Sequence, residues 1–298
     1  MKKRQLEENL FTALKEGELL PLLEAVKKDD TLDLELRGNA VNIYYRGGSL
    51  FKITEKKGDF IIYFNKKYCL EGNPILEEYP DIKTAVDNIP FYKQAMDWWF
   101  HEHPKYEREF QQVIARENNN LGNISRGTDY YIIDIEYANK FEDAENASRF
   151  DMVALKWLSD GATRKNSKKA SLALIEVKYG NGALQGNAGV SKHIEDFKVF
   201  LDNKENFKEF HKDMTKVFEQ KCKLGLVDGL QKQQFENFEI GSENAEVIFI
   251  FANHDPDSKI LDNVLQCNEL QKFSPPVYIA NSSSMGYCLY ADHMTKIK

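Results

Sequence analysis

Three charged residues stand at the ends of two apolar segments and could carry out hydrolytic chemistry together. Glu176 and Lys178 close the segment SLALIEVK at 171–178, and Asp151 lies near the start of RFDMVALKW at 149–157. Carboxylates are ligands that magnesium prefers, and a lysine beside such an ion could position or deprotonate an attacking water. Bound magnesium would act as a Lewis acid in an in-line displacement at phosphorus. The residue types therefore point to hydrolysis of a phosphate ester.

The context of the acidic-x-lysine triplet separates it from the same pattern elsewhere in the chain. Seven such triplets occur, so the bare pattern carries no weight, but only Glu176-Val177-Lys178 ends an apolar, strand-like run. Side chains alternate along a strand, so Glu176 and Lys178 share a face with the leucines that precede them. The alternative interpretation is a set of ordinary surface ion pairs, each worth under about 1 kcal/mol.

The polar segment at 159–170 decides whether Asp151 meets the triplet. It has the composition of a hairpin loop, and a loop centre near residue 164 would place Asp151 opposite Glu176 or Lys178. Directly opposed residues of an antiparallel pair lie about 5 Å apart on one face of the sheet. We therefore expect two carboxylates and an amine to converge.

The elements that must position these residues follow from the hydrophobic periodicity. Helical spacing predicts helices within 2–28, from about 81 to 118 with a restart at Pro104, and from about 190 to 201, with further polar helix to about 229. Strand patterns occupy 130–138, 149–157, 171–178 and 247–252, and the last is continuously apolar, as in a buried central strand. Short strand-like runs separated by polar turns predict an antiparallel meander at 32–36, 41–45, 49–53 and 59–64. We expect a helical and β-meander region over 1–80 and a second domain over 81–298.

The order helix, three-strand meander, helix and strand resembles that of the PD-(D/E)xK nuclease superfamily. The resemblance covers about residues 104–252 and matches Asp151 to the acid on the second strand and 176–178 to the triplet on the third. Phe150 stands where the motif has proline, a residue that the superfamily frequently lacks. The resemblance implies an α/β (α+β) fold with a restriction-endonuclease-like αβββαβ core, in which helices flank a mixed central sheet. The N-terminal helices and β-meander would extend this core.

The same resemblance implies an activity and a metal site. Members of the superfamily are metal-dependent nucleases, so we expect hydrolysis of nucleic acid phosphodiesters, in the first place DNA, in genome defence or repair. Magnesium, with manganese as a substitute, would be held by Asp151, Glu176 and the backbone carbonyl of Val177. Many members add a glutamate from the first helix, for which Glu107 and Glu109 are candidates. Each of these two glutamates could equally be a solvated helix charge.

Further polar residues surround the expected centre. Asp134 and Glu136 lie on the first strand, where either could support the site or face solvent, and Glu136 is preferred. After the triplet, a glycine-rich segment leads into a helix that carries Lys192 and His193 at its start. Exposed N–H groups at a helix start favour anions, so Lys192, His193 and Gln185 are candidate phosphate contacts. The alternative is a plain surface lysine and a packed histidine.

Composition limits the other classes of function. The net charge of −7 argues against a surface that coats nucleic acid throughout, although it leaves room for a local basic cleft. The charge favours a runner-up hypothesis, a non-catalytic nuclease-like module that binds nucleic acid or a partner protein. Scattered cysteines and the lack of a signal peptide or a long apolar run predict a cytoplasmic protein with no membrane partner. Neither of the glycine-rich motifs that bind nucleotide phosphates occurs, which argues against ATP dependence. Self-association into a homo-oligomer stays open.

Overall fold

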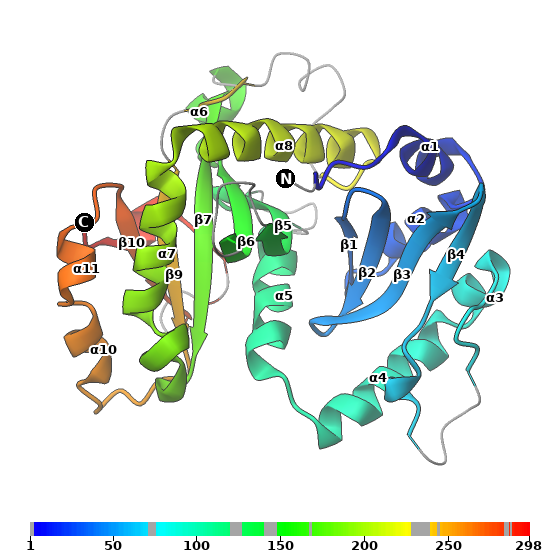
Figure 1. Cartoon of the computed structure of the whole chain (residues 1–298), viewed down its shortest axis with the longest axis horizontal. Coiled ribbons are helices and arrows are strands. Elements are labelled where there is room, and N and C mark those ends of the chain that lie inside the picture. Colours follow the sequence, from blue (N-terminus) through cyan, green and yellow to red (C-terminus); the bar gives the residue numbers. More distant parts are fainter. Residues whose placement is uncertain are drawn as a thin grey trace. The chain divides into compact units, whose positions relative to one another are not determined.

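The computed structural model describes residues 3–70, 76–119, 127–139, 148–166, 169–227, 239–242, 245–282, 286 and 288–298, with the backbone alone at 164–166 and 187. Over these residues the chain is mixed α/β, with helices and two sheets (Figure 1). It divides into two compact units. The N-terminal unit contains residues 2–116 and 216–232, and the large-sheet unit contains residues 117–215 and 233–298.

The N-terminal unit is built on a four-stranded antiparallel sheet with the strand order β1-β2-β3-β4. Its strands are β1 (Leu32–Leu36), β2 (Ala40–Tyr45), β3 (Gly48–Lys56) and β4 (Asp59–Tyr63), which confirms the expected meander. Its helices are α1 (Glu8–Glu16), α2 (Leu20–Lys28), α3 (Ile82–Asp87), α4 (Ile89–Glu102) and most of α5 (Tyr106–Asn119), with the short η1 (Lys66–Tyr68) after β4. Phe51 of β3 packs edge-on against Tyr92 of α4, with the ring centroids 4.9 Å apart. Because α4 packs on this sheet, the unit extends beyond the expected boundary at residue 80.

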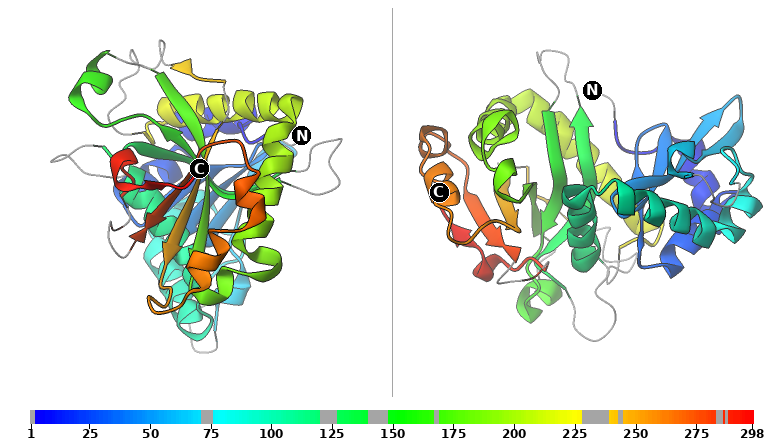
Figure 2. Two further views of the ribbon diagram at one scale, coloured as in Figure 1. Left: turned by 90° about the vertical axis from the view of Figure 1, so that its left-hand side faces the viewer. Right: turned by 90° about the horizontal axis from the view of Figure 1, so that it is seen from below.

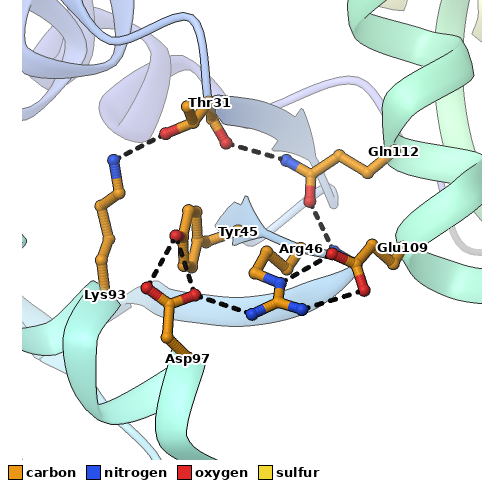
Figure 3. A network of polar contacts seen from close by, with 8 residues as sticks. Thr31, Tyr45, Arg46, Lys93, Asp97, Glu109 and Gln112 are labelled. Carbon is orange, nitrogen blue, oxygen red and sulfur yellow. Dashed lines mark hydrogen bonds and ion pairs between the residues drawn. The ribbon is translucent and has the colours of Figure 1, made fainter. Parts of the chain in front are cut away.

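The β2–β3 hairpin anchors α4 and α5 to this sheet (Figure 3). Its turn residues Arg46 and Gly47 have positive φ angles of 50° and 72°, as a tight hairpin turn requires. Arg46 donates from Nη1 to Asp97 of α4 at 2.9 Å and from Nε to Glu109 of α5 at 2.7 Å. The N–H of Gly47 donates to Oε1 of Gln112 at 2.5 Å. The tip of the β2–β3 hairpin therefore connects α4 with α5, which a short polar segment separates in the sequence.

The large-sheet unit contains, within the described part of the chain, a seven-stranded sheet with the order β11-β10-β9-β7-β6-β5 and with β8 paired to β7 off this path. Its strands are β5 (Tyr130–Asn139), β6 (Ser148–Lys156), β7 (Lys169–Tyr179), β8 (Glu239–Ile240), β9 (Glu246–Ala252), β10 (Val277–Asn281) and β11 (Thr295–Lys296). β5, β6 and β7 form an antiparallel meander, whereas β9 runs parallel to β7, and β10 runs parallel to β9. Figure 2 shows the orange and red C-terminal segments beside β9. The strands expected at 130–138, 149–157, 171–178 and 247–252 are confirmed.

The helices of this unit are α6 (Gly161–Asn166), α7 (Val190–Asp202), α8 (Lys204–Lys223, whose end lies in the N-terminal unit), α10 (Ile260–Val264) and α11 (Asn268–Gln271), with the short turns η2 (Asn181–Ala183), η3 (Gly186–Ala188) and η4 (Ala291–His293). One expectation needs correction, because the hairpin connection at 159–170 contains the helical turn α6. The helix expected at about 190–201 is observed as α7, and the further polar helix expected after it is observed as α8, which begins after Asn203. Asn203 takes extended backbone angles, which end α7.

An aromatic cluster packs α7 and α8 on the sheet. Phe150 of β6 stacks on Tyr137 of β5 and on Phe197 of α7, in both cases with the centroids 5.4 Å apart. Phe210 of α8 meets the Phe150 ring edge-on at 6.0 Å. All seven residues of β9 are buried, as its unbroken apolar sequence predicts. Among the helices of the described residues, none is both long enough and apolar enough to cross a bilayer.

Candidate functional site

The pairing of β6 with β7 brings Asp151 to the acidic-x-lysine triplet. The two strands pair from Lys156 with Ser171 to Met152 with Ile175, and Asp151 is the next residue along β6. Its Oδ2 accepts a hydrogen bond from the backbone N–H of Val177 at 2.7 Å. The Asp151 carboxylate thus lies at the middle residue of the triplet. The loop centre expected near residue 164 accounts for this register.

The Asp151 carboxylate approaches β7 along the edge of the strand. Phe150, its neighbour, contacts Phe197 of α7, so the side chain of Phe150 faces that helix. Backbone N–H groups lie in the plane of a sheet, and the Asp151 carboxylate binds one of them. This detail refines the expectation of three side chains on one face, because Asp151 joins the triplet through the backbone of β7.

Glu176 and Lys178 form a buried ion pair on one strand. The Nζ atom of Lys178 lies 2.8 Å from Oε1 of Glu176, and the two side chains are only 3% and 4% exposed, respectively. Surface ion pairs do not have this burial, so the surface interpretation is wrong for these two residues. Removing two charges from water costs several kcal/mol per ion, and close pairing only partly offsets that cost.

His193 of α7 completes the surroundings of the Glu176 carboxylate. Its Nε2 lies 3.1 Å from Oε1 of Glu176, and its side chain is 21% exposed. Burial, and then the charge of Lys178, lower the pKa of His193 to about 4, so the imidazole is neutral near pH 7. A neutral imidazole donates one hydrogen bond only, and both the Glu176 carboxylate and the backbone of Ala188 lie within reach of the His193 ring.

The glycine-rich segment after β7 brings α7 to this position. Gly180 has a φ of 77°, which favours glycine, and its N–H donates to the carbonyl of Ala252 at 2.8 Å. At Gly189, the residue before α7, a Cβ atom would lie 2.6 Å from the carbonyl carbon of Gln185. The chain can therefore fold back tightly before the helix only if glycine stands there. The sequence signalled this turn, but it did not signal that His193 would meet Glu176.

Apolar rings form the neighbouring strand of the site. Phe249 and Phe251 of β9 pair with Glu176 and Lys178, respectively, and both phenylalanines are buried. Phe197 of α7 meets Phe249 with the centroids 6.0 Å apart. Charges in such low-dielectric surroundings interact more strongly than charges in water.

The first strand presents Glu136 level with Asp151. Ile135 pairs with Met152 and Tyr137 pairs with Phe150, which leaves Glu136 across from Asp151. Glu136 is half-buried and has a φ of 50°, a left-handed conformation that is strained for a glutamate. Asp134 is fully buried and pairs with Val153. Of the two, Glu136 has the position that a supporting role requires.

The remaining candidates have other surroundings. Arg46 binds both carboxylate oxygens of Glu109, and Glu107 is half-buried in the same unit. Lys192 lies 2.8 Å from Asp196 and 3.6 Å from Glu195, whereas Gln185 is exposed. The phosphate contacts of Gln185, Lys192 and His193 stay predictions.

A magnesium ion would find two carboxylates here rather than three. Among the described residues, no group of three or more histidine, cysteine, aspartate or glutamate side chains is arranged to hold a metal ion. Magnesium needs only one or two carboxylates, because waters and substrate phosphate fill its other positions. Asp151 and Glu176, the two acids beside Val177, therefore fit magnesium better than a metal ion that needs three or more protein ligands.

Comparison of the chain with models of protein families, with curated proteins and with solved structures gives no match.

Proposed function

We propose that this protein is a metal-dependent nuclease that hydrolyses phosphodiester bonds of nucleic acid, with DNA as the expected substrate. One observation carries the proposal: the carboxylate of Asp151 binds the N–H of Val177, between a buried glutamate and a buried lysine. These are the three residue types that phosphodiester hydrolysis needs in one place. Asp151, Glu176 and Lys178 form the proposed active site.

The metal would be magnesium, with manganese as a substitute. Asp151 and Glu176 would supply carboxylate oxygens, and Val177 would supply its backbone carbonyl. In an extended strand the N–H and C=O of one residue point to the same side. Since the N–H of Val177 points to Asp151, we expect its carbonyl on that side as well. The ion would supply Lewis acidity and a template for the phosphate.

The side chains of this centre have separate tasks. Lys178 carries a donor to the place where the attacking water and the phosphate oxygens would lie, and burial strengthens its interaction with them. His193 would help to position the Glu176 carboxylate, since its Nε2 lies 3.1 Å from the same oxygen that Lys178 contacts. Glu136, level with Asp151, is the best candidate for orienting a water beside the acids. A strained backbone at Glu136 supports a functional role, because strain of about 1–3 kcal/mol persists where the surroundings enforce it.

The arrangement of elements also supports the proposal. α5 precedes the meander β5, β6 and β7, then α7 and α8 follow, and β9 adds parallel to β7. This order resembles the helix, three-strand, helix and strand order expected of a restriction-endonuclease-like αβββαβ core. A likeness of order is an argument about fold alone, so the activity rests on the site.

A second candidate is a nuclease-like module that binds nucleic acid or a protein without cleaving it. The observation that favours it is that Lys178 and His193 already engage the Glu176 carboxylate, leaving fewer groups to bind a metal. The net charge of −7 is unfavourable for a surface that binds nucleic acid broadly, so within this second candidate it favours a protein partner.

Cleavage assays on matched variants test the proposal. Purified protein would be incubated with plasmid DNA, linear duplex, single-stranded DNA and RNA, in magnesium, manganese or EDTA. Asp151→Asn removes the proposed ligand while keeping its shape. The control is Asp160→Asn, because Asp160 also accepts a backbone N–H, that of Thr163, but lies exposed at the start of α6.

We expect cleavage by the wild type and by the Asp160→Asn variant in magnesium or manganese, and none with EDTA or with Asp151→Asn. No cleavage of any substrate by the wild type, or equal cleavage by the Asp151→Asn variant, would refute the proposal. Nucleic acid binding without cleavage would establish the second candidate.

A further inference from the structure

A second group of residues suited to nucleic acid lies in the N-terminal unit, where α4 ends and α5 begins. We call it the α4–α5 corner and define it by Lys67 of η1, Trp99 and His103 at the end of α4, and Lys105 and Arg108 at the start of α5. Apart from Trp99, which is half-buried, all of these residues are exposed. None belongs to the proposed active site.

The corner contains a stacked pair of aromatic rings beneath a lysine. The rings of Trp99 and His103 lie 4.7 Å apart at an interplanar angle of 14°. The Nζ atom of Lys67 lies 5.0 Å from the centre of the Trp99 ring, within cation–π distance. Lys67 and His103 are exposed, so a ligand can reach both the cation and the end of the stack.

Positive charges gather at this stack. Burial lowers the pKa of Lys67, and the charges of Arg108 and then Lys105 lower it further, because each of these two cations lies close enough to Lys67 to repel its charge. Over the residues that the structure describes, neither Lys67 nor Lys105 has an ion pair with a carboxylate. Like charges held together in this way favour an anionic ligand that relieves their repulsion.

The corner is held rigidly by the hairpin network of Figure 3. Arg46 connects Asp97 of α4 with Glu109 of α5, so the two helices keep their mutual angle. Gly47 packs so closely on the start of α5 that a Cβ atom at Gly47 would lie 2.4 Å from the backbone of Arg108. A rigid platform loses little conformational entropy when it binds a ligand.

Further exposed rings stand on the same two helix segments. Trp98 is 52% exposed and Tyr106 is 58% exposed, high values for such large side chains. Aromatic rings interleaved with lysine and arginine are the composition of surfaces that bind unpaired nucleotides, whose bases stack while the cations follow the phosphates. A duplex hides its base faces, so these rings favour an unpaired strand over a duplex.

We propose that the α4–α5 corner binds an unpaired strand of nucleic acid, with phosphates at Lys67, Lys105 and Arg108 and a base on the outer face of His103. The biological meaning of this site rests on the proposed nuclease function, because the corner would then hold the substrate strand. The binding itself stands on the corner alone.

Binding would be measured by fluorescence anisotropy with a labelled oligothymidine, in full-length protein that carries Asp151→Asn to prevent cleavage. The test variants are the double substitution Lys67→Glu with Lys105→Glu and, separately, His103→Ala. The control is a double substitution of equal charge, Lys28→Glu with Lys57→Glu, because these lysines are also exposed and have no ion pair in the described structure. Thermal unfolding of each variant would verify that it folds.

We expect the corner double variant to weaken binding at least about tenfold. The slope of the logarithm of affinity against the logarithm of salt concentration should become shallower by about 0.7 for each phosphate that the variant no longer binds. His103→Ala should weaken binding about fivefold or more by removing a stacking partner. The control should bind like the parent protein. A duplex of the same length should bind more weakly than the single strand.

Equal binding by the corner and control variants would overturn the inference, as would duplex binding tighter than single-strand binding. Polyglutamate that displaces the oligonucleotide as well as unlabelled oligothymidine does would show an acidic protein as the occupant instead. These binding outcomes can be told apart from a failure of the proposed nuclease function, because that failure would be seen as a lack of cleavage by the wild type. Corner-dependent binding without any cleavage would support the corner and contradict the nuclease.

Discussion

Two buried lysine–glutamate pairs, one in each unit, have almost the same geometry and very different surroundings. Lys178 and Glu176 are 2.8 Å apart in the large-sheet unit, and Lys221 and Glu35 are 2.9 Å apart in the N-terminal unit. All four side chains are only 3% or 4% exposed. Burial and distance therefore do not distinguish them.

The two pairs differ in what they connect. Lys221 of α8 and Glu35 of β1 are 186 positions apart in the sequence, so their ion pair joins a helix to a sheet. Lys178 and Glu176 are two positions apart on one strand, so their ion pair joins no elements at all. The lysine–glutamate pair itself joins two elements in the first case only, whereas in the second case it is the contact of Glu176 with His193 that joins a strand to a helix. The Lys178–Glu176 pair therefore has a weaker structural reason for its burial, and the proposed catalytic role, with Asp151 and His193 beside it, would provide another.

The largest expected difference between the pairs is in activity. Lys178→Met should lower the rate of nucleic acid cleavage about 10³-fold, because it removes a buried donor from the proposed transition state. Lys221→Met, which removes an equally buried charge, should leave the rate per folded molecule unchanged. Cleavage rates of both variants, corrected for the folded fraction by circular dichroism, measure the difference. Similar losses in both variants would remove the distinction between a catalytic pair and a structural one.

The next effect is on stability. Lys221→Met removes the nearer cation of buried Glu35, which keeps only the longer contact with Arg37 at 3.8 Å, and should lower the free energy of unfolding by about 3–5 kcal/mol. Combining Lys221→Met with Glu35→Leu should recover most of that loss, because two apolar side chains replace the pair. Urea denaturation of the single and double variants provides the measurement.

The matched double variant at the other pair sharpens the comparison. Lys178→Met with Glu176→Leu should likewise regain stability relative to Lys178→Met alone, but cleavage should stay absent. Recovered cleavage in this double variant would show that the pair has no part in the chemistry.

The smallest effect concerns pH and lies beside the structural pair. Burial raises the pKa of Asp33 to about 6, although a hydrogen bond with Gln112 and the charges of Lys221 and Arg116 oppose the shift. The folded state therefore binds the proton more tightly than the unfolded state. The resulting stabilisation is complete below the ordinary pKa of 3.8 and is lost as the pH rises through about 6, a change of about 3 kcal/mol.

Asp33→Asn should remove this component of the pH dependence and leave the protein more stable than the wild type near pH 8. Asp30→Asn, which changes an exposed carboxyl three residues earlier, is the control and should keep the wild-type profile. Urea denaturation at pH 5 and pH 8 provides the measurement. Parallel pH profiles for the wild type and the Asp33→Asn variant would contradict the burial of a shifted carboxyl at this position.

Local patterns were sufficient to predict the strands that carry the site. Alternation and apolar runs located β5, β6, β7 and β9, and the length of the 159–170 connection placed Asp151 beside the triplet. The same patterns missed the approach of the Asp151 carboxylate to the Val177 N–H. Strand periodicity describes which face a side chain takes, and it carries no information about where two strands stop pairing.

Contacts between distant segments were beyond prediction. Glu109 was a candidate for supporting the site because the resemblance implies a glutamate from the first helix, yet in the structure Arg46 binds both of its oxygens across 63 positions. His193 was expected to meet phosphate, and the structure places it against Glu176. The boundary expected at residue 80 differs from the observed division because α4 packs on the N-terminal sheet.

Periodicity and charge placement are local properties, so the amino-acid sequence was enough to predict most strands and helices and the three charged residues at the ends of two strands. Which carboxylate binds which cation depends on the fold, since a glutamate pattern is the same whether its partner lies two or 186 positions away. Burial is the reason that the choice of partner affects stability. A charge removed from water must find its partner in space, and the fold alone determines which partner that is.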